Sequence, residues 1–216
     1  MKTAQEIYEE YNIIPNLQLH QLRVAAVGSI VCENLTQPVN THDVVLACLF
    51  HDMGNIIKFD LSVFPEFREP KGIEYWEGIK KDFVRRYGDV AHDANVAIAR
   101  EIGLSEAVIR LIDGVTFSNM EATAESDSME QKIAEYGDCR VGPHGILPLA
   151  TRLGEARERY LKRGKTYYSE EGFKKLSAAA EELERQIMAK CRIVPEDIND
   201  SSAAPFVETL RTYDVS

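Results

Sequence analysis

The sequence has few of the features that mark secreted, membrane-spanning or metal-clipped proteins. Only four of its 216 residues are cysteines. They are widely spaced and include no Cys-x-x-Cys pair, which argues against a disulfide framework or a zinc finger. No apolar run reaches the roughly 20 residues that a membrane span requires, and the first residues do not resemble a signal peptide. We therefore expect a reduced, cytoplasmic location and no membrane partner.

Positive charge is also scarce. The chain has 25 Lys and Arg against 35 Asp and Glu, which gives a formal net charge of -10 at pH 7. A protein that binds nucleic-acid backbones needs a basic surface, so we expect no nucleic-acid partner. A small anionic substrate is compatible with this charge, because a bound cation and a few local Lys or Arg side chains can reverse the field inside a cleft.

Signals of α-helices run through the chain, whereas convincing alternating strands do not occur. Thr3 and Glu6 form a capping-box pattern that predicts a short helix to about Tyr11. Pro15 is expected to open a second, mostly buried helix, and an amphipathic helix is predicted over residues 73–87. Residues 118–130 are polar and acidic, so a loop is predicted there. The predicted fold is an all-α helical bundle.

The composition changes beyond Gly142 and divides the sequence into two parts. We predict a helical core over residues 1–146 and additional C-terminal helices over residues 147–216 that pack on the core. The first of these helices is expected over residues 147–163, and Ser169 is expected to cap a second, longer one. The same helices could supply a homodimer surface.

Residues that bind metals well lie within or directly after apolar helical runs. The apolar run that ends at Phe50 leads straight into His51 and Asp52. Burying that carboxylate is costly unless it is paired, and a divalent metal is one such partner. His20 lies in an upstream apolar helix, and Asp138 lies in a downstream one.

This order of residues resembles the HD superfamily of metal-dependent phosphohydrolases, whose signature is a His, a His-Asp doublet and a distant Asp on helices of one bundle. The resemblance covers roughly residues 15 to 150 and implies a metal site made by His20, His51, Asp52 and Asp138. Asp113, at another helix end, competes with Asp138 for the last position. The metal could be Mn, Fe, Co, Ni, Zn or Mg.

The resemblance implies an HD-domain bundle that hydrolyses a phosphate ester of a small molecule, preferably a nucleotide. Phosphoryl transfer depends mainly on positioning and charge stabilisation, so nearby cations and polar groups are candidates for the site. The catalytic candidates are Asp52, Lys58, Asp60 and His92, and the substrate-binding candidates are Arg23, Asn55 and Arg140. Asn55 stands where several family members carry Lys or Glu. A degenerate HD module that binds a nucleotide or a protein partner without turnover is therefore the alternative.

A second His-Asp doublet, His92-Asp93, follows residues that lack a long apolar run. This setting indicates the first turn of a helix. Family members that hold a second metal usually add a further His pair downstream, and that pair is missing here. We therefore expect one metal, with His92 in substrate binding, proton transfer or helix capping.

Overall fold

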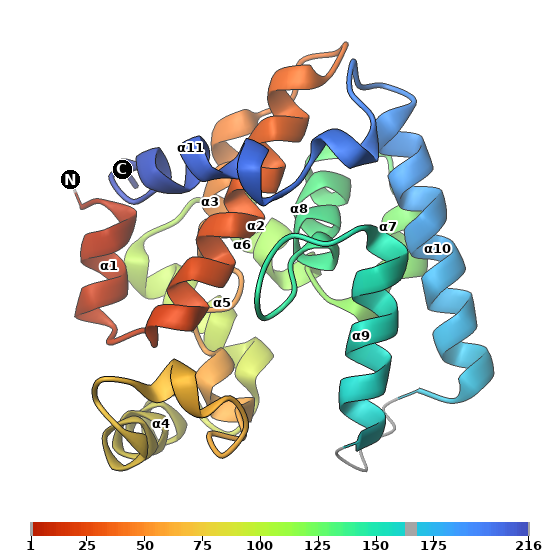
Figure 1. Cartoon of the computed structure of the whole chain (residues 1–216). Coiled ribbons are helices and arrows are strands. Elements are labelled where there is room, and N and C mark those ends of the chain that lie inside the picture. The colour runs from red at the N-terminus through yellow and green to blue at the C-terminus, as the bar shows by residue number, and fades with distance from the viewer. Residues whose placement is uncertain (1, 163–167, 216) are drawn as a thin grey trace.

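The computed structural model describes residues 2–162 and 168–215, and these residues form a helical bundle (Figure 1). Their α-helices are α1 (Ala4–Glu10), α2 (Pro15–Asn34), α3 (Thr41–Phe50), α4 (Ile73–Tyr87), α5 (Ala91–Ile102), α6 (Glu106–Gly114), α7 (Met120–Glu125), α8 (Met129–Arg140), α9 (Leu149–Lys162), α10 (Glu170–Met188) and α11 (Asp200–Leu210). Four short 3-10 helices are η1 (Asn55–Lys58), η2 (Pro65–Arg68), η3 (Phe117–Asn119) and η4 (Pro195–Asp197). Extended pairing within the described ranges is limited to isolated bridges. The all-α prediction is confirmed.

Local capping explains where several helices begin. The Thr3 hydroxyl accepts a hydrogen bond from the Glu6 amide, and the Glu6 carboxylate accepts one from the Thr3 amide. The capping box of α1 is therefore confirmed. Ser128 accepts a hydrogen bond from the Gln131 amide at the start of α8, and Ser169 accepts one from the Gly172 amide at the start of α10. The Asn40 side chain caps α3 by accepting a hydrogen bond from the Asp43 amide. The predicted end of α9 at residue 163 lies outside the described residues.

The loop predicted over residues 118–130 is wrong for most of its length. Residues 120–125 form α7, in which Met120 and Thr123 are buried. The helix packs against α10 and α8. Glu121 and Glu125, whose charge suggested a loop, lie on α7, and this helix forms because Met, Ala and Glu are good helix formers and its Met120, Thr123 and Ala124 side chains are buried.

Helix α2 is the centre of the bundle, and α3, α8 and α11 pack around it. Close approach of α8 depends on Gly137, because a Cβ at that position would lie 3.1 Å from the Val24 carbonyl oxygen. This contact brings the C-terminal part of α8 towards the N-terminal half of α2. The end of α3 is held nearby, where Tyr8 donates a hydrogen bond to the Leu49 carbonyl.

The C-terminal helices lie against the rest of the bundle. Helix α11 crosses α2, and α10 packs against α7 and α8 (Figure 1). Leu183 and Ile187 of α10 are fully buried in this packing. The division of the chain at residue 146 stays a prediction. Among the helices of the described residues, none combines the length and the hydropathy that a membrane span needs.

Candidate metal centre

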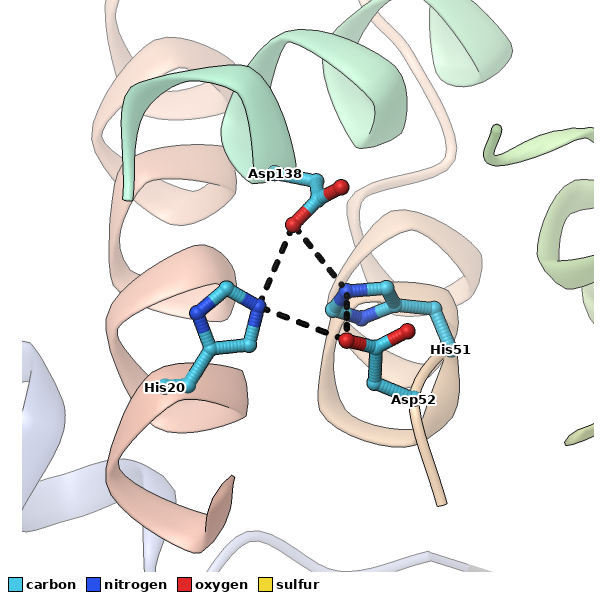
Figure 2. Close-up of side chains that lie close together, drawn as sticks. All are labelled: His20, His51, Asp52 and Asp138. Carbon is cyan, nitrogen blue, oxygen red and sulfur yellow. Dashed lines mark hydrogen bonds and ion pairs between the residues drawn. The ribbon is translucent and has the colours of Figure 1, made fainter. Parts of the chain in front are cut away.

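Three helices bring two imidazoles and two carboxylates together. His20 lies on the second turn of α2, His51 and Asp52 directly follow α3, and Asp138 lies near the C-terminal end of α8 (Figure 2). The apolar residues of α3 from Val44 to Phe50 are all buried, so the end of this helix is drawn into the core with the doublet.

The four side chains face one another across a small space. Each offers one nitrogen or oxygen, and these four atoms all lie within 4.8 Å of one another. His20 Nε2 lies 3.1 Å from Asp138 Oδ1 and 3.6 Å from Asp52 Oδ2. His51 Nε2 lies 3.5 Å from Asp138 Oδ1 and 3.7 Å from Asp52 Oδ2 (Figure 2). Most of these separations are too long for good hydrogen bonds.

His51 shows which of its ring nitrogens is available to a ligand. Its Nδ1 lies 2.9 Å from the Cys48 carbonyl oxygen. A carbonyl only accepts, so Nδ1 carries a proton and Nε2 is the nitrogen that faces the other ligand atoms. That Nε2 atom is buried and has no hydrogen-bond partner among the described residues. A buried polar atom without a hydrogen-bond partner requires an explanation, and a role as a metal ligand provides one.

The electrostatics of the cluster are those of opposite charges held out of water. Burial alone would lower the pKa of His51, but the carboxylates of Asp52 and Asp138 outweigh it and raise that pKa to about 9. Burial also opposes the charged form of Asp138, yet the hydrogen bond from His20 and the proximity of His51 hold its pKa well below its usual range. The carboxylates therefore favour the positively charged form of His51, and the two histidines favour the negatively charged form of Asp138.

The spacing of the four atoms fits one divalent ion. Two ligand atoms at about 2.0–2.2 Å from an ion, at angles of roughly 90° to 110°, stand about 2.8–3.6 Å apart. The separations of 3.1 Å to 3.7 Å in the cluster are close to this range. Imidazole and carboxylate together suit several transition metals. His20, His51, Asp52 and Asp138 are thus the residues that could hold the metal.

Two buried amides position the doublet, and neither was identified from the sequence. Gln21 accepts a hydrogen bond from the Asp52 amide at 3.1 Å, and Asn95 of α5 accepts one from the Gly54 amide at 2.6 Å. A Cβ on Gly54 would lie 2.5 Å from the Ala94 Cβ, so α5 packs directly on the backbone there. Gln21 adjoins His20 in the sequence, which is the one signal that could have indicated it.

Glu135 is a third acidic group near the cluster that sequence reasoning missed. It is fully buried and accepts a hydrogen bond from the Thr116 amide at 2.8 Å. Burial, with a smaller contribution from Asp138, raises its pKa to about 8. Glu135 is one turn before Asp138 on α8. Its pKa is raised mainly by burial and further by the negative charge of Asp138.

The two arginines that were predicted to bind substrate both contact other groups of the protein. Arg140 is 1% exposed, and its guanidinium donates to the carbonyls of Leu147 and Ile198 at 2.6 Å and 2.9 Å. It therefore anchors the C-terminal segment on α8, which corrects the expectation that it contacts substrate. Arg23 lies three residues after His20 and pairs with Asp200 at 3.4 Å.

The other candidates after the doublet lie on η1 and the following turn. Asn55 is buried, and its Oδ1 has no hydrogen-bond partner among the described residues. Lys58 is exposed, and Asp60 accepts a hydrogen bond from the Ser62 hydroxyl at 2.6 Å. Lys58 and Asp60 line an open pocket of 420 Å³ together with Lys80 and others, but none of the four cluster residues lines it. These two side chains are therefore not part of the cluster.

His92 and Asp113 are close to each other but outside the cluster. His92 Nε2 lies 2.9 Å from Asp113 Oδ1, and the two side chains are 39% and 64% exposed. Helices α5 and α6 supply them. Of the two acids considered for the last metal position, Asp138 lies with His20 and His51, whereas Asp113 pairs with His92.

The comparisons with known proteins agree with this arrangement. A family model described as HD domain matches residues 18–194, a range that contains all four cluster residues. The comparisons with curated proteins and with solved structures found no match.

Proposed function

The chain belongs to the HD-domain family, and from that we propose that it is a metal-dependent phosphohydrolase for a small phosphate ester, preferentially a nucleotide. The family match covers residues 18–194 and so includes every ligand candidate. HD domains bind divalent metals, and the His/Asp cluster offers a place for one. The substrate and the metal's identity belong to the proposal.

One observation carries this proposal: four ligand atoms converge, and one of them, the buried Nε2 of His51, has no hydrogen-bond partner among the described residues. A structural imidazole in the core would satisfy both of its nitrogens. Here one nitrogen is oriented by the Cys48 carbonyl and the other is directed at two carboxylates. Such a hydrogen bond to the far nitrogen is the usual support for a metal-bound histidine.

The side chains suggest distinct roles in phosphate hydrolysis. When bound, a divalent ion supplies Lewis-acid polarisation of the phosphoryl group and makes water nucleophilic near neutral pH. Asp52 is 19% exposed at its side chain and so reaches solvent, where its carboxylate can orient a water and accept its proton. Arg23 lies three residues after His20, on the same face of α2, and places a positive charge beside the substrate's phosphate.

The substrate is proposed to be small and no nucleic acid or membrane is proposed as a partner. The acidic chain, with its net charge of -10, repels long polyanions. A single phosphate needs only the local positive charge of the site.

The test combines metal analysis with a substrate screen. The purified protein is analysed for Mn, Fe, Co, Ni and Zn, reconstituted with each of these or Mg, and assayed for phosphate release. Nucleoside monophosphates, cyclic nucleotides and sugar phosphates are the substrates. Metal-dependent turnover that His51→Ala abolishes is the expected result. A metal-loaded protein that binds nucleotides but turns over none would instead support a binding module, and a protein that takes up no metal would contradict the site itself.

A further inference from the structure

Three aromatic rings from two separate segments meet beside the connection between α8 and α9. Phe64 and Phe67 come from the start and the middle of η2, and His144 comes from the turn after α8. The ring centroids of Phe64 and Phe67 are 5.0 Å apart, and His144 lies 5.5 Å from Phe64 and 5.6 Å from Phe67. We call these three residues the aromatic cluster.

The aromatic cluster lies outside the core. Phe64 and Phe67 are half-buried and His144 is exposed. Neither phenylalanine is among the described hydrophobic residues that pack against the core. Large aromatic residues usually contribute to stability through core burial, so these rings need another explanation.

The backbone at Phe64 is held in an unfavourable conformation. Its φ of 59° and ψ of 68° lie in the left-handed region, which bulky residues rarely adopt. Surrounding structure must hold such a residue in place, and residues of this kind gather at ligand sites. The strained backbone aims the Phe64 ring at His144, where the two rings meet edge to face at 82°.

The segment that carries His144 is linked to α2, the helix of His20, by an ion pair and a hydrogen bond. His20 and Arg23 share one face of α2. Arg23 Nε pairs with Asp200 Oδ1 at 3.4 Å, and Asp200 accepts a hydrogen bond from the Ile146 amide at 3.3 Å. Ile146 is two residues after His144. From the other direction, Phe64 follows the His-Asp doublet along the chain. Phe64 lies twelve residues after Asp52 and His144 lies six residues after Asp138, so each segment of the aromatic cluster follows a residue of the metal centre along the chain.

We propose that the aromatic cluster binds the base of a nucleotide substrate by stacking, while the metal centre and Arg23 bind its phosphate. This inference rests on the proposed function and specifies its substrate class. A flat base can stack on partly exposed rings regardless of its identity. The two regions then divide one ligand between an aromatic end and an anionic end.

Equilibrium binding provides the test, because it does not depend on turnover. Adenosine, guanosine, cytidine and uridine, together with their 5′-monophosphates and ribose 5-phosphate, are titrated into the metal-loaded protein by calorimetry. The variants are Phe67→Leu, which keeps an apolar side chain without a ring face, and His144→Ala, which truncates an exposed residue. Phe173→Leu is the matched control, since Phe173 belongs to a separate ring cluster with Phe117.

Both aromatic-cluster variants should weaken nucleotide binding about tenfold and leave ribose 5-phosphate binding and melting temperature unchanged, while Phe173→Leu should bind as the wild type does. Nucleotide binding that is equal in all variants, or absent while ribose 5-phosphate binds, would overturn the inference. Binding that requires a base, without any phosphate release, would support the aromatic site and contradict the proposed hydrolase activity. The two proposals can therefore fail separately.

Discussion

The dipeptide His-Asp occurs twice, at residues 51–52 and 92–93, and the two copies have different surroundings. His51 is 3% exposed and follows the apolar, buried residues 44–50 of α3, within reach of His20 and Asp138. The second doublet opens α5, where His92 is 39% exposed at its side chain and pairs with Asp113. Identical residues thus form part of a four-residue cluster in one place and a surface ion pair in the other.

The difference shows that burial, rather than residue type, makes a candidate metal site. An exposed ion pair contributes little because water screens it. The Asp52 and Asp138 side chains, 19% and 31% exposed, lie against the buried His51, and two carboxylates held this close together are costly unless a bound proton or a cation offsets their charge. The first doublet has this requirement and the second does not, and each of the following predictions tests that contrast.

The largest effect is expected from removing the first doublet. His51→Ala and Asp52→Ala should each abolish metal binding and lower phosphate release by about a thousandfold or more, because the ion's charge stabilisation is lost. Elemental analysis and a phosphate assay measure both effects. Asp93→Ala, in the second doublet, should change neither, and His92→Ala should keep the bound metal. Loss of metal in His92→Ala alone would reverse the assignment of the two doublets.

The next effect concerns Glu135, the buried acid beside the first cluster. The folded protein binds this proton more tightly than the unfolded chain, since burial raises the pKa from 4.5 to about 8. Protonated Glu135 contributes fully to the free energy of unfolding below pH 4.5. As the pH rises to about 8, a contribution on the order of 4 kcal/mol is lost.

Glu135→Gln should remove this pH dependence. Urea denaturation of metal-free protein at pH 5 and pH 8 measures the free energy of unfolding, and the variant should gain stability relative to the wild type at pH 8. Asp113→Asn is the control beside the second doublet, where the carboxylate is 64% exposed. It should keep the wild-type profile. A Glu135→Gln profile identical to that of the wild type would contradict the prediction.

A smaller effect is expected at Gly54, which follows the first doublet and packs on the helix that carries the second. Gly54→Ala forces a Cβ to within 2.5 Å of Ala94, and overpacking of this kind costs about 2 kcal/mol. Gly78→Ala in α4 is the matched control, because its Cβ meets no atom within 4 Å. It should raise stability slightly, since Ala favours helix over Gly. Thermal denaturation that ranks the two variants in the opposite order would be inconsistent with this packing.

The smallest effect is expected from the support of the first doublet. Gln21→Ala removes the acceptor of the Asp52 amide and should weaken metal affinity about tenfold. Gln18, on the same helix, bonds to the Ile13 carbonyl instead. Gln18→Ala should therefore leave metal affinity unchanged in a competition titration with a chelator. Equal affinities in both variants would show that Gln21 has no part in holding the site.

The sequence by itself determined the helices whose signals are local. A cap acts within a single turn, so Thr3 and Ser169 indicated the starts of α1 and α10. The apolar run before His51 likewise predicted its burial. Together with the family resemblance, these patterns indicated the all-α fold and the four residues that the structure brings together.

Only the tertiary structure decided what each side chain contacts. The direction of Arg140 towards the C-terminal segment and the support from Asn95 arise between elements far apart in the sequence. Such contacts depend on how closely whole helices approach, as α8 approaches α2 at Gly137. Close packing of the complete core fixes those distances, and no local pattern contains them.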